Sequence, residues 1–160
     1  MYISHCQHTH SITNSHYRCI AWQRVRTANQ LANSGPEWSD LVGQYNSGTY
    51  NNQYMILDGK LFTPGQAMQE NTLYVVEQIP GLVVGGDASN ELEKGYWSSY
   101  NVPYHKEIYV KSGYPEVDAK GGVATYTQYQ QAPRAKIFRQ DQSTVKDLET
   151  MQRVMRANGK

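Results

Sequence analysis

The chain has 160 residues, of which 39% are hydrophobic, and its 15 basic and 14 acidic side chains give a net charge of +1. This length suits one domain, and the composition is that of an ordinary globular protein. The basic residues form no block and no basic-aromatic stripe, so no nucleic-acid partner is expected. No run approaches the roughly 18 apolar residues of a membrane-spanning helix, and the start MYISHCQHTH lacks the apolar core of a secretory signal peptide.

Residues 1–18 differ in composition from the rest of the chain and are expected to form a divergent, disordered tail. They hold four of the five histidines and show no apolar periodicity. Imidazole and thiolate groups bind zinc or copper, so a metal-binding tail is one alternative. The spacing matches no structural zinc pattern, and we therefore expect no metal and no cofactor. The candidate ligands in and beside this tail are His5, Cys6, His8, His10, His16 and Cys19.

Two helices are expected after the tail. Apolar residues recur at helical spacing over residues 21–32, and Ser34-Gly35-Pro36 then ends the first helix and starts the second. Gly35 is expected to cap the first helix at its C-terminal end. Trp22 and Trp38 lie on the apolar stripes of the two helices, so both are expected in the core.

A polar run, Asn46-Ser47-Gly48-Thr49-Tyr50-Asn51-Asn52-Gln53-Tyr54, follows the helices. Its side chains hydrogen-bond the local backbone readily, which is typical of a structured turn. A plain polar surface loop is an almost equally good interpretation. Strand patterns come next at residues 50–57, 73–79 and 82–84, with turn residues between them, and predict one antiparallel sheet. Glu77 interrupts the second strand, and we expect it to face solvent or the sheet edge, with a catalytic acid as the alternative.

The C-terminal half gives weaker patterns. Residues 88–94 are expected to form a short helix, and residues 96–105 combine aromatic and small hydroxyl side chains, as either a lined cleft or a packed aromatic corner would. Residues 133–142 are interpreted as an extended turn segment. The closing helix is expected to start with a capping box of Thr144 and Asp147. The side chains expected on its buried face are Val145, Leu148, Met151 and Met155.

Longer motifs carry a family resemblance. In chain order they are AWQRVRTAN, NSGTYNNQYMILD, LYVVEQIPG, KGYWSSYNVPYH, SGYP, PRAKIFRQDQS and MQRVMRAN. Together they resemble the phospholipase B-like proteins over about residues 20–158. Residues 1–18 and about 115–131 depart from the family pattern. Residues 19–160 are therefore interpreted as a central segment, an internal fragment, of a phospholipase B-like domain.

The resemblance implies an α+β fold, namely part of the αββα sandwich of N-terminal-nucleophile hydrolases, with an antiparallel sheet and flanking helices. In such enzymes self-cleavage exposes an amino-terminal cysteine whose thiol attacks an acyl carbonyl while its own α-amine takes the proton. The implied substrate is a phospholipid or a related acyl amide, and the choice between ester and amide stays open. The implied setting is lysosomal or secreted, with contact to a membrane surface.

Two residues match the family's site. Asn101, in Ser99-Tyr100-Asn101-Val102-Pro103, matches the asparagine proposed to donate to the oxyanion of the tetrahedral intermediate, with an ordinary turn asparagine as the alternative. Arg134 matches the family's active-site arginine, whose charge can lower a neighbouring thiol pKa and orient the site. A structural salt bridge is the alternative for Arg134.

Neither cysteine of this chain occurs in the sequence context of the family's nucleophile. Cys6 is followed by a poor strand, and Cys19 lies at the edge of the first helix. We therefore expect the nucleophile on an upstream part of the same precursor, and we expect no turnover by this chain alone. The alternative is a non-catalytic remnant that binds lipid or a partner protein through residues 96–104.

Overall fold

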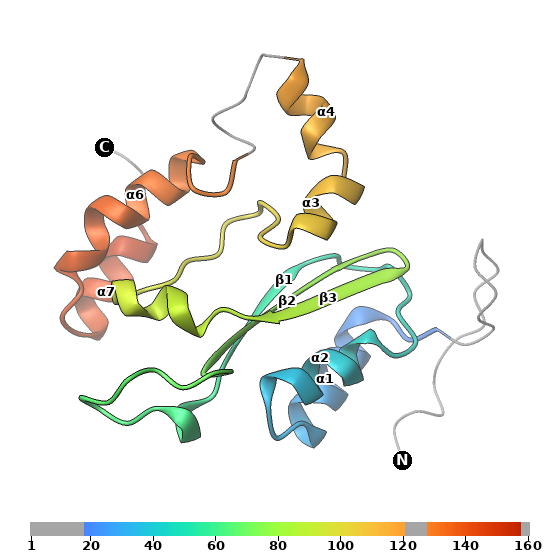
Figure 1. Ribbon diagram of the computed structural model, residues 1–160, viewed down its shortest axis with the longest axis horizontal. Coiled ribbons are helices and arrows are strands. Elements are labelled where there is room, and N and C mark those ends of the chain that lie inside the picture. Colours follow the sequence, from blue (N-terminus) through green and yellow to red (C-terminus); the bar gives the residue numbers. More distant parts are fainter. Residues whose placement is uncertain (1–17, 121–127, 158–160) are drawn as a thin grey trace.

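The computed structural model describes residues 18–120 and 128–157 (Figure 1). Its centre is a three-stranded antiparallel sheet in the order β1-β2-β3. The strands are β1 (Gln53–Leu57), β2 (Leu73–Ile79) and β3 (Leu82–Asp87). Helices pack on both faces of this sheet, which confirms the expected α+β class, the antiparallel pairing and the flanking helices. A second sheet, as an αββα sandwich would require, does not occur within the described residues.

Two helices, α1 (Ala21–Leu31) and α2 (Gly35–Gly43), cover one face of the sheet. Because strand side chains alternate between faces, Tyr54, Ile56 and Val76 all point toward these helices. The buried centre of this layer consists of Ala28, Trp38, Val42 and Val76. The predicted helix pair and the core position of Trp38 are therefore confirmed.

The boundary between α1 and α2 differs from the prediction. Ala32 is the C-cap of α1, and Ser34 is the N-cap of α2, where its hydroxyl accepts a hydrogen bond from the Glu37 N–H at 3.3 Å. Gly35 is the first residue of α2 and does not cap α1. A Cβ atom at Gly35 would lie 2.3 Å from the Cβ of Tyr74. A glycine is needed here because α2 approaches the sheet closely.

The Asn46–Tyr54 run forms the structured turn that its composition favoured. The Asn46 side chain accepts a hydrogen bond from the Gly48 N–H at 2.8 Å and donates one to the Ile79 carbonyl at 3.0 Å. The buried guanidinium of Arg24 donates to the Asn46 side-chain oxygen at 3.3 Å and to that of Gln78 at 3.0 Å. The turn is thereby fixed to α1 and to the end of β2.

Segments that follow β3 in the chain pack on the opposite face of the sheet. Leu73 and Val75 are buried there against Ala88, and Leu92, Trp97 and Tyr104 pack around them. The short helices are η2 (Gly59–Leu61) after β1, η3 (Ser89–Lys94) after β3, then α3 (Lys106–Lys111) and α4 (Tyr114–Ala119). The short helix expected over residues 88–94 is thus confirmed as a 3₁₀ helix, whereas α3 and α4 were not predicted.

The C-terminal part is helical and corrects two expectations. Residues 133–142, interpreted as an extended turn, form α6 (Pro133–Asp141) and the start of η4 (Gln142–Thr144). Proline is well tolerated at the first helical position, so Pro133 begins the helix. The last helix, α7 (Leu148–Met155), has a capping box, but Asp147 is the N-cap and Thr150 its partner. Thr144 is not part of it.

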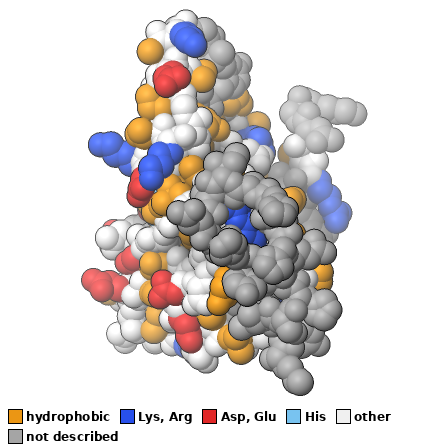
Figure 2. Space-filling model, turned by 90° about the vertical axis from the view of Figure 1, so that its right-hand side faces the viewer, with side chains coloured by type: hydrophobic (Ala, Val, Ile, Leu, Met, Phe, Trp, Pro, Cys, Tyr) orange, Lys and Arg blue, Asp and Glu red, His pale blue; other side chains and the backbone are white. Residues whose placement is uncertain are grey.

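Several side chains expected in the core are exposed. Trp22 is 63% exposed, and on α7 Leu148, Met151 and Met155 are 73%, 46% and 62% exposed. On the face shown in Figure 2, hydrophobic side chains lie at the surface between acidic and basic ones. Within the described ranges, no helix is long and apolar enough to cross a membrane. The expected burial of these side chains is therefore wrong, because the described residues provide nothing to cover them.

Candidate active site

The structure brings the two residues carried by the resemblance into contact. Arg134 Nη1 donates a hydrogen bond to Asn101 Oδ1 at 3.0 Å. Since a guanidinium can only donate, this contact fixes the side-chain oxygen of Asn101 toward Arg134 and turns its amide nitrogen elsewhere. Among the described residues, Asn101 Nδ2 has no hydrogen-bond acceptor. The pair therefore presents an oriented, unused N–H donor.

The backbone around Asn101 holds it outward. Asn101 is exposed and has a positive φ of 20°, which asparagine tolerates better than most residues. Its neighbours Tyr100 and Val102 are buried, at 3% and 9% exposure, against Ala132 and Ala135. An exposed polar side chain between two buried anchors is positioned by the core beneath it.

Arg134 projects from the first turn of α6. That turn contains no acidic side chain, and the helix begins with Pro133 after the buried Ala132. A cation near a helix N-terminus is unfavourable for the helix, because the unpaired backbone N–H groups there already carry partial positive charge. The arrangement instead concentrates positive potential beside Asn101. Such potential would stabilise a negative charge that develops next to the pair.

Glu77 was expected at the surface or edge, and this is wrong. It is 3% exposed, and its carboxylate accepts hydrogen bonds from the backbone N–H groups of Tyr104 and His105, both at 2.8 Å, and from Gln53 Nε2 at 2.6 Å. These donors compensate the cost of burying the charge. Glu77 thus fixes the segment that follows Asn101 to the centre of the sheet. Glu77 also lines the cavity that contains Asn101 in its wall, so the catalytic-acid alternative stays a prediction.

His105 also joins the segment after Asn101 to the sheet. Its Nε2 lies 2.9 Å from the Val75 carbonyl oxygen, so this nitrogen carries the hydrogen that is donated. A Cβ atom at Gly86 would lie 3.0 Å from the His105 ring, and glycine leaves room for the imidazole over β3. The segment from Asn101 to His105 is therefore fixed to β2 by Glu77 and to β3 by close packing.

A cavity of about 260 Å³ opens beside Asn101. Its walls come from the end of the polar run, the C-terminal half of β2, the segment around Asn101 and the α3–α4 region. Much of the lining is polar, which suits a reacting carbonyl group and its substituents better than a long acyl chain. The polar lining residues include Asn51, Asn52, Gln53, Glu77, Ser99 and Asn101.

The aromatic rings of residues 96–105 form a packed corner, and other parts of the same segment line the cavity beside Asn101. The rings of Tyr100 and Tyr129 lie 4.6 Å apart, and Trp97 stacks on Tyr129 at 6.1 Å. Burial raises the pKa of Tyr100 to about 12, and burial also raises the pKa of Tyr129. The Tyr129 hydroxyl donates to the Ser98 carbonyl at 2.7 Å. Tyr100 is buried, whereas Tyr96 and Tyr104 are partly exposed, so the remnant alternative, which involves residues 96–104, stays a prediction.

The structure tests the expectations about cysteines and metal ligands only for the residues that it describes. Cys19 is disulfide-bonded, so it offers neither a nucleophilic thiol nor a thiolate ligand. Cys6 and the histidines of the tail lie outside the described residues. Within residues 18–120 and 128–157, no three His, Cys, Asp or Glu side chains are grouped to hold a metal ion.

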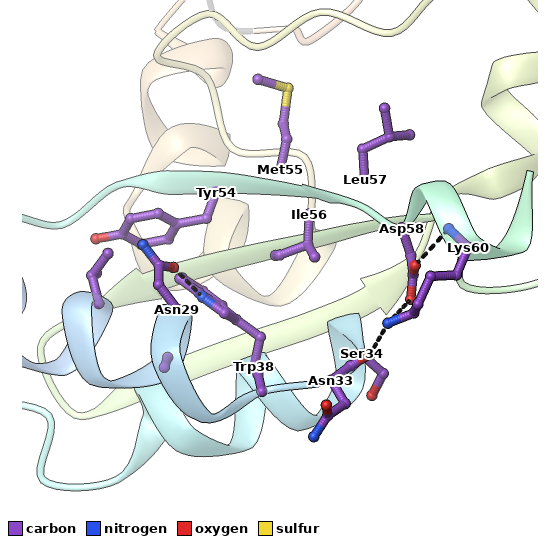
Figure 3. A pocket seen from close by; sticks show the side chains of 13 residues that line it. Asn29, Asn33, Ser34, Trp38, Tyr54, Met55, Ile56, Leu57, Asp58 and Lys60 are labelled. Atoms are coloured by element: carbon purple, nitrogen blue, oxygen red, sulfur yellow. Dashed lines mark hydrogen bonds and ion pairs between the residues drawn. The ribbon is translucent and has the colours of Figure 1, made fainter.

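A second cavity, of about 500 Å³, lies between α1 and β1 on the other face of the sheet (Figure 3). Tyr54 and Ile56 point into it, whereas Met55 and Leu57 point away from it. Its charged groups, Asp58 and Lys60, form an ion pair at 3.3 Å. Its lining includes neither Asn101 nor Arg134, and it is separated from Asn101 by the sheet. We therefore place the candidate active site at the smaller cavity.

The structure thus defines an α+β chain with a polar cavity and an amide–guanidinium pair at its rim. The sequence profile of the phospholipase B family matches residues 5–159. The chain belongs to this family. The matched range begins within the tail, in residues that the structure does not describe.

Named relatives agree with the profile. Phospholipase B-like 1 of Rattus norvegicus is 55% identical over 139 residues, which are 87% of this chain and 25% of the relative. Phospholipase B of Crotalus adamanteus is 50% identical over 139 residues, again 87% and 25% of the two chains. Phospholipase B-like protein D of Dictyostelium discoideum is 40% identical over 156 residues, 92% and 27% of the two chains. The chain spans about a quarter of the length of these relatives.

Proposed function

We propose that this chain supplies the oxyanion-stabilising part of a phospholipase B-like hydrolase that deacylates phospholipids or related acyl amides. The observation that carries the proposal is the 3.0 Å hydrogen bond from Arg134 to Asn101 at the rim of the polar cavity. Family membership supports the substrate class, since the relatives are named phospholipase B or phospholipase B-like.

In this proposal the described sheet is part of an N-terminal-nucleophile hydrolase sandwich. The cysteine nucleophile comes from an upstream part of the same precursor, because neither Cys6 nor Cys19 has the sequence context of the family's nucleophile and Cys19 is also disulfide-bonded. When a thiolate adds to an acyl carbonyl, the carbonyl oxygen becomes negatively charged. Asn101 Nδ2 donates to that oxygen, and Arg134 holds the amide in place and adds positive potential.

The disulfide bond at Cys19 also supports the lysosomal or secreted setting. Disulfides persist in oxidising compartments and are rare in the cytosol. The compartment remains part of the proposal, together with the membrane-surface contact that a phospholipid substrate requires.

A chimera tests the proposal. The 139 residues of Crotalus adamanteus phospholipase B that match this chain are replaced by the matching residues of this chain, and fatty acid release from phosphatidylcholine is measured. We expect an active chimera, in which Asn101→Ala lowers kcat about 100- to 1000-fold. Asn90→Ala, at an exposed asparagine outside the site, is the matched control and should leave kcat unchanged.

Two results would contradict the proposal. One is an Asn101→Ala chimera that keeps the rate of its parent while remaining folded. The other is phospholipid deacylation by this chain alone that disappears on Cys6→Ser, because it would place the nucleophile in the tail.

A further inference from the structure

The cavity beside Asn101 has polar side chains in its wall that the fold itself does not use. They come from three separate segments: the end of the polar run, the residues just before Asn101, and the corner between α3 and α4. Within the described residues, none of these side chains makes a hydrogen bond to the protein. Such amide and hydroxyl groups are available to bind a ligand. They belong to Asn51, Asn52, Ser99 and Ser112.

The charge of the cavity wall is unsuited to a phosphate group. The lining contains no lysine and no arginine, and its one charged residue is Glu77. The Glu77 carboxylate already accepts hydrogen bonds from Gln53, Tyr104 and His105, and its negative charge repels an anion. The unused amides and hydroxyls are neutral, and they both donate and accept hydrogen bonds. A neutral hydroxyl group is therefore the best partner for them.

The size of the cavity limits what it can hold. Its volume is about 260 Å³, whereas pockets that enclose a drug-sized ligand have roughly 300–1,000 Å³. A long hydrocarbon chain in this space would also displace water from the unused polar groups without replacing its hydrogen bonds. The carbon atoms of a small polyol, by contrast, would lie against the apolar part of the wall. That part consists of Ile79, Val102, Pro103 and Ile108.

An acyl carbonyl bound at Asn101 has two substituents, the acyl chain and the leaving group. We propose that the cavity binds the leaving group, that this group bears free hydroxyls, as the glycerol of a monoacylated lipid does, and that the acyl chain stays outside. Asn52 and Ser99 are specificity-determining residues that bind these hydroxyls. This inference rests on the proposed function, because it takes Asn101 as the oxyanion donor. It adds which end of the substrate the cavity selects.

Glyceryl and propyl esters test the preference for hydroxyls, because they have the same carbon skeleton in the leaving group and only the glyceryl group has free hydroxyls. We expect the Crotalus adamanteus chimera to show a kcat/KM about tenfold higher for glyceryl than for propyl butyrate. Asn52→Ala and Ser99→Ala should each reduce this ratio about threefold. Asn90→Ala and Ser143→Ala, at exposed residues outside the cavity, are the matched controls and should keep the ratio.

Narrowing the cavity tests which end of the substrate enters it. Ser112 is exposed at the cavity wall, so Ser112→Leu should keep the native circular dichroism spectrum while filling part of the space. If the leaving group enters, kcat/KM should fall by the same factor, about tenfold, for glyceryl butyrate and glyceryl octanoate. If the acyl chain enters instead, the octanoate should lose more than the butyrate.

Three results would overturn this inference while leaving the proposed function intact. They are an active chimera that hydrolyses glyceryl and propyl esters equally well, a ratio that Asn52→Ala and Ser99→Ala both leave unchanged, and a selective loss of the octanoate on Ser112→Leu. The proposed function fails separately, because it requires Asn101→Ala to lower the rate for every ester. A chimera that is inactive toward all of them would overturn both.

Discussion

Arg134 and Asn101 are 33 positions apart in the chain, yet a guanidinium nitrogen of one lies 3.0 Å from the side-chain oxygen of the other. The buried contacts of Tyr100 and Val102 with Ala132 and Ala135 hold the two segments together directly beneath this bond. The pair is therefore a consequence of the core, and its orientation is set before any substrate arrives.

The two residues should act as one unit in catalysis. In the Crotalus chimera, Arg134→Ala should lower kcat because Asn101 loses the partner that orients it. The double variant Arg134→Ala with Asn101→Ala should be little worse than Asn101→Ala alone, since effects within one hydrogen-bonded unit are not additive. The measurement is a double-mutant cycle on kcat. Fully additive losses would mean that Arg134 acts independently of Asn101.

Glu77→Gln should destabilise the fold strongly. The substitution replaces a carboxylate that accepts three hydrogen bonds with an amide whose NH₂ group would face a backbone or side-chain donor. We expect the free energy of unfolding to fall by about 2–4 kcal/mol. Urea unfolding measures this change. Glu93→Gln, at an exposed glutamate, is the control and should change stability by less than about 0.5 kcal/mol.

Tyr100 should make the fold sensitive to alkali. Burial raises its pKa from 10.0 to about 12, so the folded state holds the phenol proton more tightly than the unfolded state does. Its contribution is complete below pH 10 and is lost as the pH rises toward about 12. Urea midpoints across this range should fall less for Tyr100→Phe than for the parent. Tyr50→Phe, at a 76% exposed tyrosine, should behave like the parent.

Gly35→Ala should show whether Gly35 is needed for close packing or for backbone flexibility. The new Cβ would lie 2.3 Å from Tyr74 Cβ and 2.7 Å from its Cγ, so α2 must move away from the sheet. We expect a loss of about 1–3 kcal/mol in the free energy of unfolding. Gly59→Ala is the control, because no atom lies within 4 Å of its added Cβ. An equal loss at both positions would show that contact with Tyr74 is not the cause, since the effect of Gly→Ala on the unfolded chain alone is stabilising.

The sheet and the first two helices could be predicted from the sequence because their signals are local. Alternation and turn residues predict β1 to β3, and helical spacing predicts α1 and α2. The sequence of α6 also contained a signal, since Ala132, Ala135 and Phe138 recur every third residue toward the core. Pro133 and the surrounding charges favoured a turn, although proline is compatible with the first helical position.

The environment of Glu77 could not be predicted in this way. A carboxylate within an apolar strand is usually solvent-exposed, and the backbone donors that bury this one are 27 and 28 positions away. A local sequence pattern cannot predict hydrogen-bond partners that are so far away in the chain. The resemblance supplied Asn101 and Arg134 as single residues, and only the structure shows that they touch.

The buried guanidinium of Arg24 joins α1, α2, the polar turn and β2 without any carboxylate. Its acceptors are the carbonyl oxygens of Cys19 and Val42 and the side-chain amides of Asn46 and Gln78. None of these four groups gains a proton in mildly acidic solution, and Arg24 itself stays charged there. Acidification that would weaken an ordinary ion pair therefore leaves this cross-link intact.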